Sequence, residues 1–536
     1  MSETKKDKLV YLLIGLIATA FFCIIYGVKV LNPQYVEWLM AGIDLPQHYL
    51  GWVAYRNSPW TFPLGLGNQL SYPADMSVVF SDSVPLLALI FKVMSPILPR
   101  TFQYTGWVGL LSFIMQGVLA ARIFRHYSDN RIAIIVMSIF FSLSPIALYR
   151  MYSQVTLTFC WILLIGIEML LCYDKYSSGV KVFGIILILG ILSGGTQLYF
   201  ILMNGIIVFG ICVIDMIENK RVLRSALYLS DFVISAGFVV WIMGGFSIKN
   251  SGSAPGLGIY SFNLNGFVNP MGWSSILPDL NVHAPEQVYG FAYYGMGLLI
   301  LILIATAIVL RQHKLKYLWT TYKAQIIASI IVGTISLIIA ASPKVTLFGA
   351  ILVMYELPKK LMELWGIFRT TQRVIWVLWY LIAIVAGIVI LKYMKREVVC
   401  YFLLFLLILQ IYDIHIPLQE IHSLYANESS YVDPMQDKIW DDIVQDDDIQ
   451  HVVCSSYFDL NKMYPLADWA LKNNLTYNIF YFARAIDFDQ EGYAERLMLN
   501  PTTDNVYVFD ESEADKCELY DLNYKYADGL IIGRVK

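Results

Sequence analysis

The chain has 536 residues, of which 57% are hydrophobic and 15% are charged, and its mean hydropathy is +0.59. Soluble domains carry about 25% charged residues, so this composition excludes a soluble enzyme or binding module and indicates a polytopic membrane protein. The net charge of −3 is unevenly distributed, because residues 414–536 contain 23 acidic and 9 basic residues whereas residues 1–413 contain 18 and 29. We therefore predict a transmembrane domain at 1–413 and a soluble, acidic domain at 414–536.

Apolar segments close to the twenty or so residues that cross a bilayer recur along the first domain. They predict eleven transmembrane helices, near residues 9–29, 104–124, 132–149, 155–173, 181–198, 199–217, 225–246, 293–310, 324–341, 374–391 and 398–413. The first follows three lysines but lacks a small-residue cleavage pattern, so we interpret it as a retained anchor. Residues 84–98 are apolar but too short to cross and are interrupted by Lys92 and Pro96. We expect a juxtamembrane or half-inserted helix there.

The loops in which lysine and arginine cluster all fall on the side of the N-terminus, which the positive-inside rule assigns to the cytoplasm. This topology places the acidic domain outside, together with three long loops at residues 30–103, 247–292 and 342–373. The inner loops are short, and the sequence has no phosphate-binding or dinucleotide-binding glycine motif. We therefore expect a multi-pass protein of the plasma membrane whose chemistry takes place on the outer face.

The first outer loop, residues 30–103, carries an isolated acid, Asp44, directly before a predicted helix. A carboxylate beside a membrane span is costly to keep unless something uses it, and His48 lies one helical turn further on. Asp44 is therefore a candidate catalytic residue, with helix capping as the structural alternative. Asp82 is a second candidate, and it could equally cap the helix expected at 84–98. His48 and Tyr72 are candidate substrate-binding residues.

Basic residues of two further outer segments suit an anion. The third outer loop ends in Arg369-Thr-Thr-Gln-Arg373, immediately before a span, and its two arginines lie one turn apart. Arg150 and Gln154 lie in another outer turn. We interpret these four side chains as candidates to hold a phosphate at the membrane surface. The alternative is that the arginines only reach for lipid headgroups.

The order of these elements resembles the C-type (GT-C) glycosyltransferases, which have a first span, a long outer loop with an early aspartate, many further spans and an outer C-terminal domain. Four segments are more closely similar to a family of bacterial polytopic membrane proteins within that superfamily: Ser58–Gly65, Phe80–Leu87, Phe368–Trp376 and Tyr481–Arg484. The resemblance implies a mainly α, polytopic membrane fold of the GT-C kind with a small C-terminal extracytoplasmic α/β domain.

The resemblance also implies an inverting glycosyltransferase that takes a sugar from a polyprenyl-phosphate donor and passes it to a cell-envelope glycan or lipid-linked acceptor. In this scheme Asp44 is the general base, and cations stabilise the departing lipid phosphate. Several members of the superfamily pair two adjacent acids, often with a metal, whereas here Leu45 follows Asp44. A second acid would have to come from Asp82, so we assign no cofactor, with a divalent metal as the alternative. We expect no nucleic-acid partner.

Two other functions stay open, a transporter or flippase of lipid-linked saccharides and a non-catalytic envelope-assembly protein. A transporter typically shows repeated halves and polar groups near the membrane midplane. Here the polar and basic clusters gather at the predicted outer boundary, which favours an enzyme.

The C-terminal domain shows the pattern of a small α/β fold. We expect strands at His451–Ser455, Asn505–Phe509 and Gly529–Gly533 and a helix near Leu466–Asn473. Its acidity is typical of a solvated face, and glycan binding is the alternative. Cys454 and Cys517 could meet in this domain, and the sequence leaves their pairing open.

Overall fold

The computed structural model describes residues 5–42, 44–176, 179–247, 258–312, 314–341, 343–366, 368–427, 429, 431–483 and 488–535. The chain forms two compact units. The first unit contains residues 1–32, 104–238 and 252–428, and the second contains residues 33–103, 239–251 and 429–536. The long first loop and the C-terminal segment therefore fold into the same unit, although about 330 residues of other chain separate them in the sequence.

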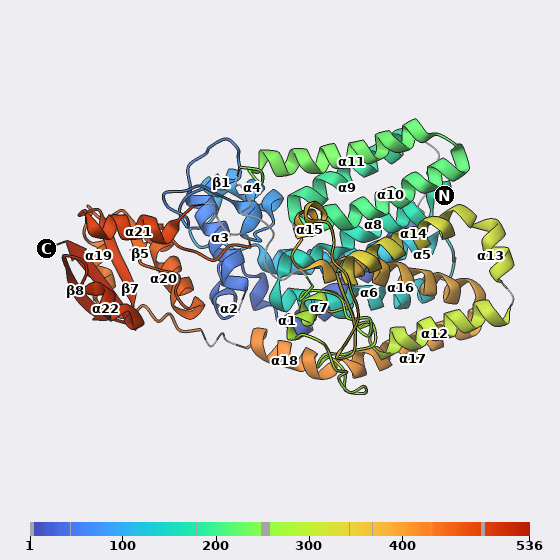
Figure 1. Ribbon diagram of the computed structural model, residues 1–536. Coiled ribbons are helices and arrows are strands. Elements are labelled where there is room, and N and C mark those ends of the chain that lie inside the picture. The colour runs from blue at the N-terminus through green and yellow to red at the C-terminus, as the bar shows by residue number, and fades with distance from the viewer. Residues whose placement is uncertain are drawn as a thin grey trace. The chain divides into compact units, whose positions relative to one another are not determined.

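The first unit is a helical bundle (Figure 1). Its helices are α1 (Lys5–Tyr26), α5 (Thr105–Arg125), α6 (Arg131–Ser142), α7 (Pro145–Ser153), α8 (Trp161–Leu171), α9 (Gly179–Thr196), α10 (Tyr199–Asn219), most of α11 (Val222–Ile242), α12 (Met296–Arg311), α13 (Leu315–Thr321), α14 (Lys323–Ala341), α15 (Lys359–Gly366), α16 (Ile375–Tyr393), α17 (Arg396–Asp413) and α18 (His415–Tyr425). Strands β3 (Lys344–Leu347) and β4 (Ala350–Met354) form an antiparallel hairpin between α14 and α15.

Every segment predicted to cross the membrane coincides with a helix of this bundle. In the described residues seven helices are long and apolar enough to cross, and three bent pairs raise that number to as many as ten. The remaining predicted span, 155–173, corresponds to the shorter apolar helix Val155–Leu171, whose first turns are 3₁₀. The protein is thus a multi-pass membrane protein. Residues 84–98 form only a nine-residue helix, α4 (Pro85–Val93), followed by a 3₁₀ turn.

The packing of the helices depends on which face of each helix carries apolar and small residues. Helix α1 buries Val10, Ile14, Ala18 and Phe22, a stripe with a spacing of four residues. That stripe faces α5, where a Cβ atom on Gly117 would lie 2.7 Å from Ile14 and 2.4 Å from the hydroxyl of a serine on α6. Close approach of backbones at glycine is the usual means of association between membrane helices, because lipid offers no hydrophobic driving force.

A break after α6 redirects the chain towards one end of the bundle. Ser144 accepts a hydrogen bond from the amide of Ala147 at 3.2 Å and so caps α7, and Pro145 occupies the first turn of that helix. Helices α6 and α7 differ in direction by 42°. Helix α7 then ends at Ser153, so Arg150 lies in its last turn and Gln154 is its C-cap residue.

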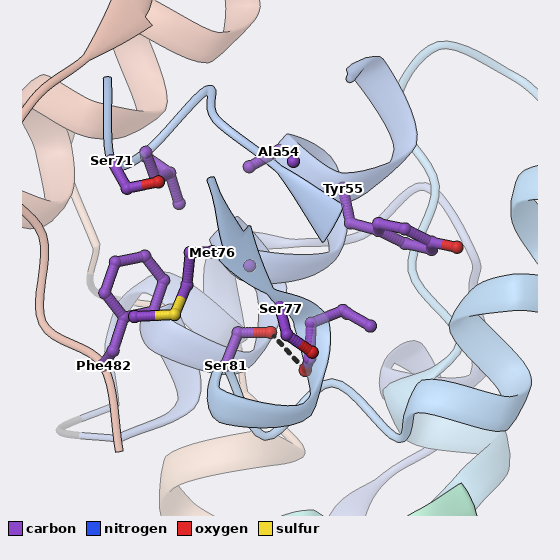
Figure 2. Close-up of a pocket in the computed structure, with 11 residues that line it drawn as sticks. Ala54, Tyr55, Ser71, Met76, Ser77, Ser81 and Phe482 are labelled. Carbon is purple, nitrogen blue, oxygen red and sulfur yellow. Dashed lines mark hydrogen bonds between the residues drawn. The ribbon is translucent and has the colours of Figure 1, made fainter. Parts of the chain in front are cut away.

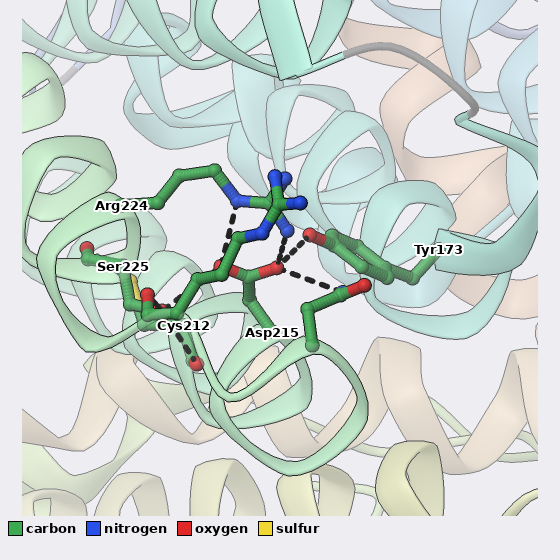
Figure 3. A network of polar contacts seen from close by, with 7 residues as sticks. Tyr173, Cys212, Asp215, Arg224 and Ser225 are labelled. Atoms are coloured by element: carbon green, nitrogen blue, oxygen red, sulfur yellow. Dashed lines mark hydrogen bonds and ion pairs between the residues drawn. The ribbon is translucent and has the colours of Figure 1, made fainter.

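At the other end of the bundle, basic side chains of the loops are paired with buried acids. Asp7 contacts Arg125 at 2.9 Å and Arg131 at 3.1 Å, which places these loops beside the N-terminal segment. Figure 3 shows a second such network, in which Asp215 of α10 receives hydrogen bonds from Arg224 and Tyr173. Asp7 and Asp215 are 2% and 0% exposed, so pairing compensates the cost of burying their charges.

The second unit contains a five-stranded sheet and the folded first loop. Its elements are α2 (Glu37–Met40), α3 (Leu45–Asn57), β1 (Leu66–Gly67), β2 (Met76–Ser77), α4, α19 (Ile439–Val444), β5 (His451–Cys454), α20 (Leu460–Lys472), β6 (Thr476–Tyr477), α21 (Gln490–Leu499), β7 (Asn505–Asp510), α22 (Ala514–Cys517), β8 (Leu522–Ala527) and β9 (Leu530–Val535). The strand order is β6-β5-β7-β9-β8, with β5 parallel to β6 and β7 and the remaining pairs antiparallel.

The predicted strands correspond to β5, β7 and β9, and the predicted helix lies within α20. Strand β7 is buried over Asn505–Phe509 and so forms the middle of the domain core. Cys454 and Cys517 are both free thiols. The change in composition placed the domain boundary after Asp413, whereas α18 packs against α1 in the first unit and the second unit resumes at Ser429.

The first loop is joined to this sheet through the backbone. Tyr72 donates its amide hydrogen to the carbonyl of Tyr477 at 3.1 Å, and Tyr477 donates to the carbonyl of Gln69 at 2.7 Å. The ring of Tyr72 also stacks on His451, with the ring centroids 4.0 Å apart. Residues 69–72 therefore continue the edge of the sheet beyond β6, which leaves that edge paired rather than exposed.

Candidate functional site

Helix α3 carries the first candidate acid at its N-terminus. Asp44 is the N-cap residue and Pro46 stands in the first turn, but the Asp44 side chain makes no capping hydrogen bond. Helix α3 is buried nearly all round, and Trp52 donates its indole hydrogen to the carbonyl of Phe102 at 2.9 Å. Capping, the structural alternative for Asp44, is therefore not what its carboxylate does in this structure.

The second candidate acid lies in a turn with unusual backbone geometry. Asp82 has φ of 54° and Val84 has φ of 49°, in the left-handed region that side chains other than glycine seldom adopt. Val84, not Asp82, is the N-cap of α4, so the expectation that Asp82 caps this helix is wrong. For a β-branched residue such a conformation costs free energy, and strained turns of this kind concentrate at functional sites.

His48 interacts electrostatically with both of these acids. Its side chain is buried and its Nε2 has no hydrogen-bond partner. Burial lowers the pKa of His48, and the negative charges of Asp82 and Asp44 oppose that shift. The structure thus brings Asp44, His48 and Asp82 into one unit, with a buried imidazole near two carboxyl groups.

A network of serines holds the Asp82 turn against α3. Ser83 donates to the backbone carbonyl of His48 at 2.7 Å, and the Ser81 and Ser83 hydroxyls lie 2.9 Å apart. Gly51 makes this approach possible, because a Cβ atom there would lie 2.3 Å from the Cβ of Ser81. The sequence signal for this turn was the pair of serines around Asp82, which the sequence analysis did not use.

A small cavity of about 20 Å³ lies on the other side of Ser81 (Figure 2). Its lining residues include Gly51, Ala54, Tyr55, Ser71, Met76, Ser77, Ser81 and Phe482. A cavity of this volume has room for about one water molecule, and three serines and a tyrosine are among the residues that line it. It can therefore hydrate the serine network but is too small for a sugar or a lipid.

In the first unit, the predicted basic residues form a second cluster. Oε1 of Gln154 accepts a hydrogen bond from Arg150 at 2.8 Å and another from Arg373 at 2.7 Å. Arg150 also donates to the carbonyl of Tyr289 at 2.6 Å and is 0% exposed, while Arg373 is 8% exposed. Two segments of the chain thus meet at one amide oxygen, and a third contacts Arg150 through the Tyr289 carbonyl.

Aromatic rings complete this arginine cluster. The guanidinium of Arg150 lies 4.7 Å from the ring centroid of Tyr149 and 5.2 Å from that of Trp376, and that of Arg373 lies 4.9 Å from Tyr199. Tyr199 also accepts a hydrogen bond from the amide of Thr370 at 2.9 Å. Sequence reasoning missed Tyr199, although its position in the tight turn between two predicted spans was a usable signal.

The electrostatic state of Arg373 differs from that of the loop arginines at the other end of the bundle. Within the described residues no acid lies within ion-pair distance of Arg373, and its buried Nε has no hydrogen-bond partner. A buried guanidinium without a counter-ion is costly. Binding of an anion would remove that cost.

Two of the predicted substrate-binding residues, Arg369 and Tyr72, belong to neither of these two clusters. Arg369 lies 5.1 Å from the ring of Tyr260 and makes no contact with Gln154 in the described structure. Tyr72 belongs to the sheet edge beside His451. Arg484, the last residue of the fourth resemblance segment, and residues 248–257 of the middle outer loop lie outside the described residues.

No group of three or more His, Cys, Asp or Glu side chains within the described ranges is placed to hold a metal ion. Asp44 and Asp82 supply two carboxylates, but the imidazole near them is deeply buried. We derive no step through a metal from these groups.

The helical bundle with its sheet-containing C-terminal domain defines a membrane protein with a GT-C-like fold, which confirms the predicted fold class. The oligosaccharyltransferase of Archaeoglobus fulgidus in its apo form has a TM-score of 0.50 and 11% sequence identity, covering 95% of this chain and 71% of that chain. At this identity the likeness concerns the fold alone.

The chain belongs to the family described as a domain of unknown function (DUF6311), whose model matches residues 15–415. Residues 439–535 match the DUF6311 C-terminal domain. No curated protein matches the sequence.

Two further solved structures are similar. Archaeal oligosaccharyltransferase AglB from Archaeoglobus fulgidus, in complex with an inhibitory peptide and a dolichol-phosphate, has a TM-score of 0.49 and 11% identity, covering 96% of this chain and 71% of that chain. ArnT from Cupriavidus metallidurans in the apo state has a TM-score of 0.44 and 10% identity, covering 97% of each chain.

Proposed function

We propose that the protein is a membrane glycosyltransferase that takes a sugar from a polyprenyl-phosphate donor and passes it to a cell-envelope glycan or lipid-linked acceptor. The observation that carries the proposal is the state of Asp44, whose carboxylate stands at a helix N-terminus without capping it and beside a buried, neutral imidazole. A carboxylate in such surroundings suits a general base. The shared fold with an oligosaccharyltransferase agrees with this reading, although fold does not fix activity.

In the proposed reaction Asp44 accepts the proton of an acceptor hydroxyl as its oxygen attacks the anomeric carbon of the donor. The bond between that carbon and the phosphate oxygen breaks, and the lipid phosphate departs with the bonding electrons, so the anomeric configuration inverts. The side chain of His48 and the turn that carries Asp82 form the surroundings of the Asp44 carboxylate. The arginine cluster of the first unit offers positive charge that suits the phosphate of a lipid-linked donor.

Arg373 supports the phosphate assignment independently of the acid. It is buried, it lacks an acidic partner in the described residues, and Gln154 holds it next to Arg150. Arginine forms paired hydrogen bonds with phosphate oxygens, and the neighbouring rings exclude water, which strengthens the attraction. The proposed localisation is the plasma membrane of a bacterium, with the N-terminus inside and this cluster at the outer face.

The test is transfer by the purified full-length protein in liposomes. Undecaprenyl-phosphate-linked radiolabelled hexoses serve as donors and an extract of the host envelope as acceptor, and release of undecaprenyl phosphate is measured. Asp44→Asn should lower transfer by about 10²- to 10⁴-fold while leaving donor binding intact. The matched control is Asp75→Asn, because Asp75 is an exposed acid of the same loop. Full transfer by Asp44→Asn would contradict the mechanism.

The transporter alternative predicts a different result in the same vesicles. A flippase moves the labelled lipid between leaflets without releasing undecaprenyl phosphate, so translocation without transfer would exclude the proposed enzyme. Loss of transfer in Asp44→Asn together with unchanged release in Asp75→Asn supports it.

A further inference from the structure

A large cavity lies among α12, α13, α14 and α16 of the first unit. Its volume is about 670 Å³, within the range of ligand-binding cavities. Most of its lining is aliphatic, including Ile302, Ala305, Val309, Ile326, Ile330, Leu337, Leu378, Leu381, Ile382, Val385 and Val389. An apolar space of this size inside a membrane domain favours a hydrocarbon chain over water.

Lys392, Tyr322 and Tyr393 line one end of this cavity. Nζ of Lys392 donates a hydrogen bond to the hydroxyl of Tyr322 at 3.0 Å and lies 5.1 Å from the centroid of that ring. The centroid of the Tyr393 ring lies 5.7 Å from Nζ of Lys392 and 5.5 Å from Nζ of Lys314. Lys392 and the tyrosines thus form a cationic end of a mostly apolar cavity, and Lys314 adds a second positive charge beside it.

These lysines differ from the neighbouring arginines in their partners. Arg125 and Arg224 are neutralised by Asp7 and Asp215, whereas in the described residues neither Lys392 nor Lys314 has an acid within ion-pair distance. Tyrosine rings and a phenol oxygen stabilise an ammonium only in part. The cationic end is therefore complementary to an external anion.

The dimensions match a lipid at a membrane surface. The lining residues of α16 extend from Leu378 to Tyr393, which is about 22 Å along a helix. One leaflet with its headgroup region is about 20–22 Å thick. Helix α13 turns by 92° from α12 beside the cationic end and exposes Leu315, Tyr317 and Trp319. Exposed aromatic and aliphatic residues on a short helix are typical of the headgroup level.

We propose that this cavity binds an anionic phospholipid of the bilayer, with an acyl chain along α16 and its phosphate between Lys392 and Lys314. The site is distinct from the arginine cluster, because Arg373 precedes the first residue of α16 and Lys392 is next to its last, a separation of about 28 Å along the helix. Basic pockets between membrane helices on the cytoplasmic side are known lipid-headgroup sites, and the positive-inside rule assigns this end to the cytoplasm.

The experiment is lipid binding to the full-length protein in detergent, followed by native mass spectrometry during titration with phosphatidylglycerol or phosphatidylcholine. Phosphatidylglycerol should bind more tightly than phosphatidylcholine, and Lys392→Gln should weaken its binding by about fivefold, the contribution of one basic residue near an anionic lipid surface. Lys395→Gln is the matched control, since Lys395 is exposed and lies three residues away at the same end of the bundle.

A second variant tests the acyl chain. Thr306→Phe places a ring in the cavity from the α12 side and should weaken both lipids, while the thermal midpoint and the size-exclusion profile verify that the variant folds. Equal binding of both phospholipids, or equal loss in Lys392→Gln and Lys395→Gln, would overturn the proposal. Tighter binding of undecaprenyl phosphate than of phosphatidylglycerol would also overturn it, because the occupant would then be the lipid carrier.

Discussion

Arg373 donates a hydrogen bond to Oε1 of Gln154 at 2.7 Å, although 219 residues separate them in the sequence. The same oxygen accepts from Arg150, so one neutral amide holds two guanidinium groups of like charge together. Like charges repel at this range unless a counter-ion is present. An amide supplies a partial charge only, and within the described residues Arg373 has no acid at ion-pair distance, so its positive charge is available to a ligand.

The shared amide gives a prediction in which stability and binding change in opposite directions. Gln154→Glu places a carboxylate between the two arginines, so we expect a higher thermal midpoint and a lower affinity for undecaprenyl phosphate, measured by differential scanning fluorimetry and by binding to the purified protein. Gln154→Ala leaves buried donors without an acceptor and should destabilise the fold by about 1–3 kcal/mol. If Gln154→Glu were to stabilise the protein without weakening lipid-phosphate binding, the cluster would have only a structural role.

The order of apolar segments was sufficient to predict the bundle because each span must satisfy its own backbone within the membrane. The meeting of Arg150 with Arg373 was predicted from topology, since both fall in turns on the same side. The folding of residues 33–103 with the C-terminal sheet was not predicted. It depends on backbone pairing of Gln69 and Tyr72 with Tyr477, and backbone hydrogen bonds leave no signature in side-chain pattern.

The conformation of the turn at Asp82 also could not be predicted from the sequence pattern. The residues Ser-Val-Pro after Asp82 suggested an N-cap, because aspartate is a common capping residue. In the structure the positive φ of Asp82 and Val84 moves the helix start to Pro85 and turns the Asp82 backbone away from the cap position. That backbone geometry is determined by contacts between the turn and α3, a helix that is not adjacent to the turn in the sequence.

Transfer should be independent of divalent metal ions. Asp44 is followed by Leu45, and the described residues contain no group of three potential metal ligands. Treatment of the full-length protein in liposomes with EDTA should therefore change the rate of undecaprenyl phosphate release by less than twofold, as an order-of-magnitude expectation against the 10²-fold or greater loss typical of removing a catalytic group. A large loss that Mg²⁺ or Mn²⁺ restores would contradict the assignment of catalysis to side chains alone.

Gly51 controls the approach of the Asp82 turn to α3. Gly51→Ala places a methyl group 2.3 Å from the Cβ of Ser81, so the turn must shift, and we expect a destabilisation of about 1–3 kcal/mol. Transfer should fall more than folding alone explains, because the shift displaces Asp82 relative to His48. The comparison is Gly184→Ala on α9, where a Cβ atom would meet nothing within 4 Å. Equal effects of the two substitutions on transfer would refute the positioning role of Gly51.

The buried imidazole of His48 predicts how stability depends on pH. Burial lowers the pKa of His48 in the folded state, and the charges of Asp82 and Asp44 only partly counter this, whereas the unfolded value is about 6.5. Below that value the unfolded chain binds a proton that the folded protein does not, so stability present above pH 6.5 is lost as the pH falls towards the folded pKa. The loss amounts to about 1.4 kcal/mol for each unit between the two pKa values.

The measurement is the thermal midpoint in detergent between pH 8 and pH 5 for the native protein and for His48→Gln. The glutamine variant cannot take up this proton, so its midpoint should fall less over the range below pH 6.5, while the two curves run parallel above it. Parallel curves over the whole pH range would mean that His48 has the same pKa in the folded and unfolded states. The imidazole would then not be a neutral, buried group near Asp44 and Asp82, and the proposed environment of the general base would be wrong.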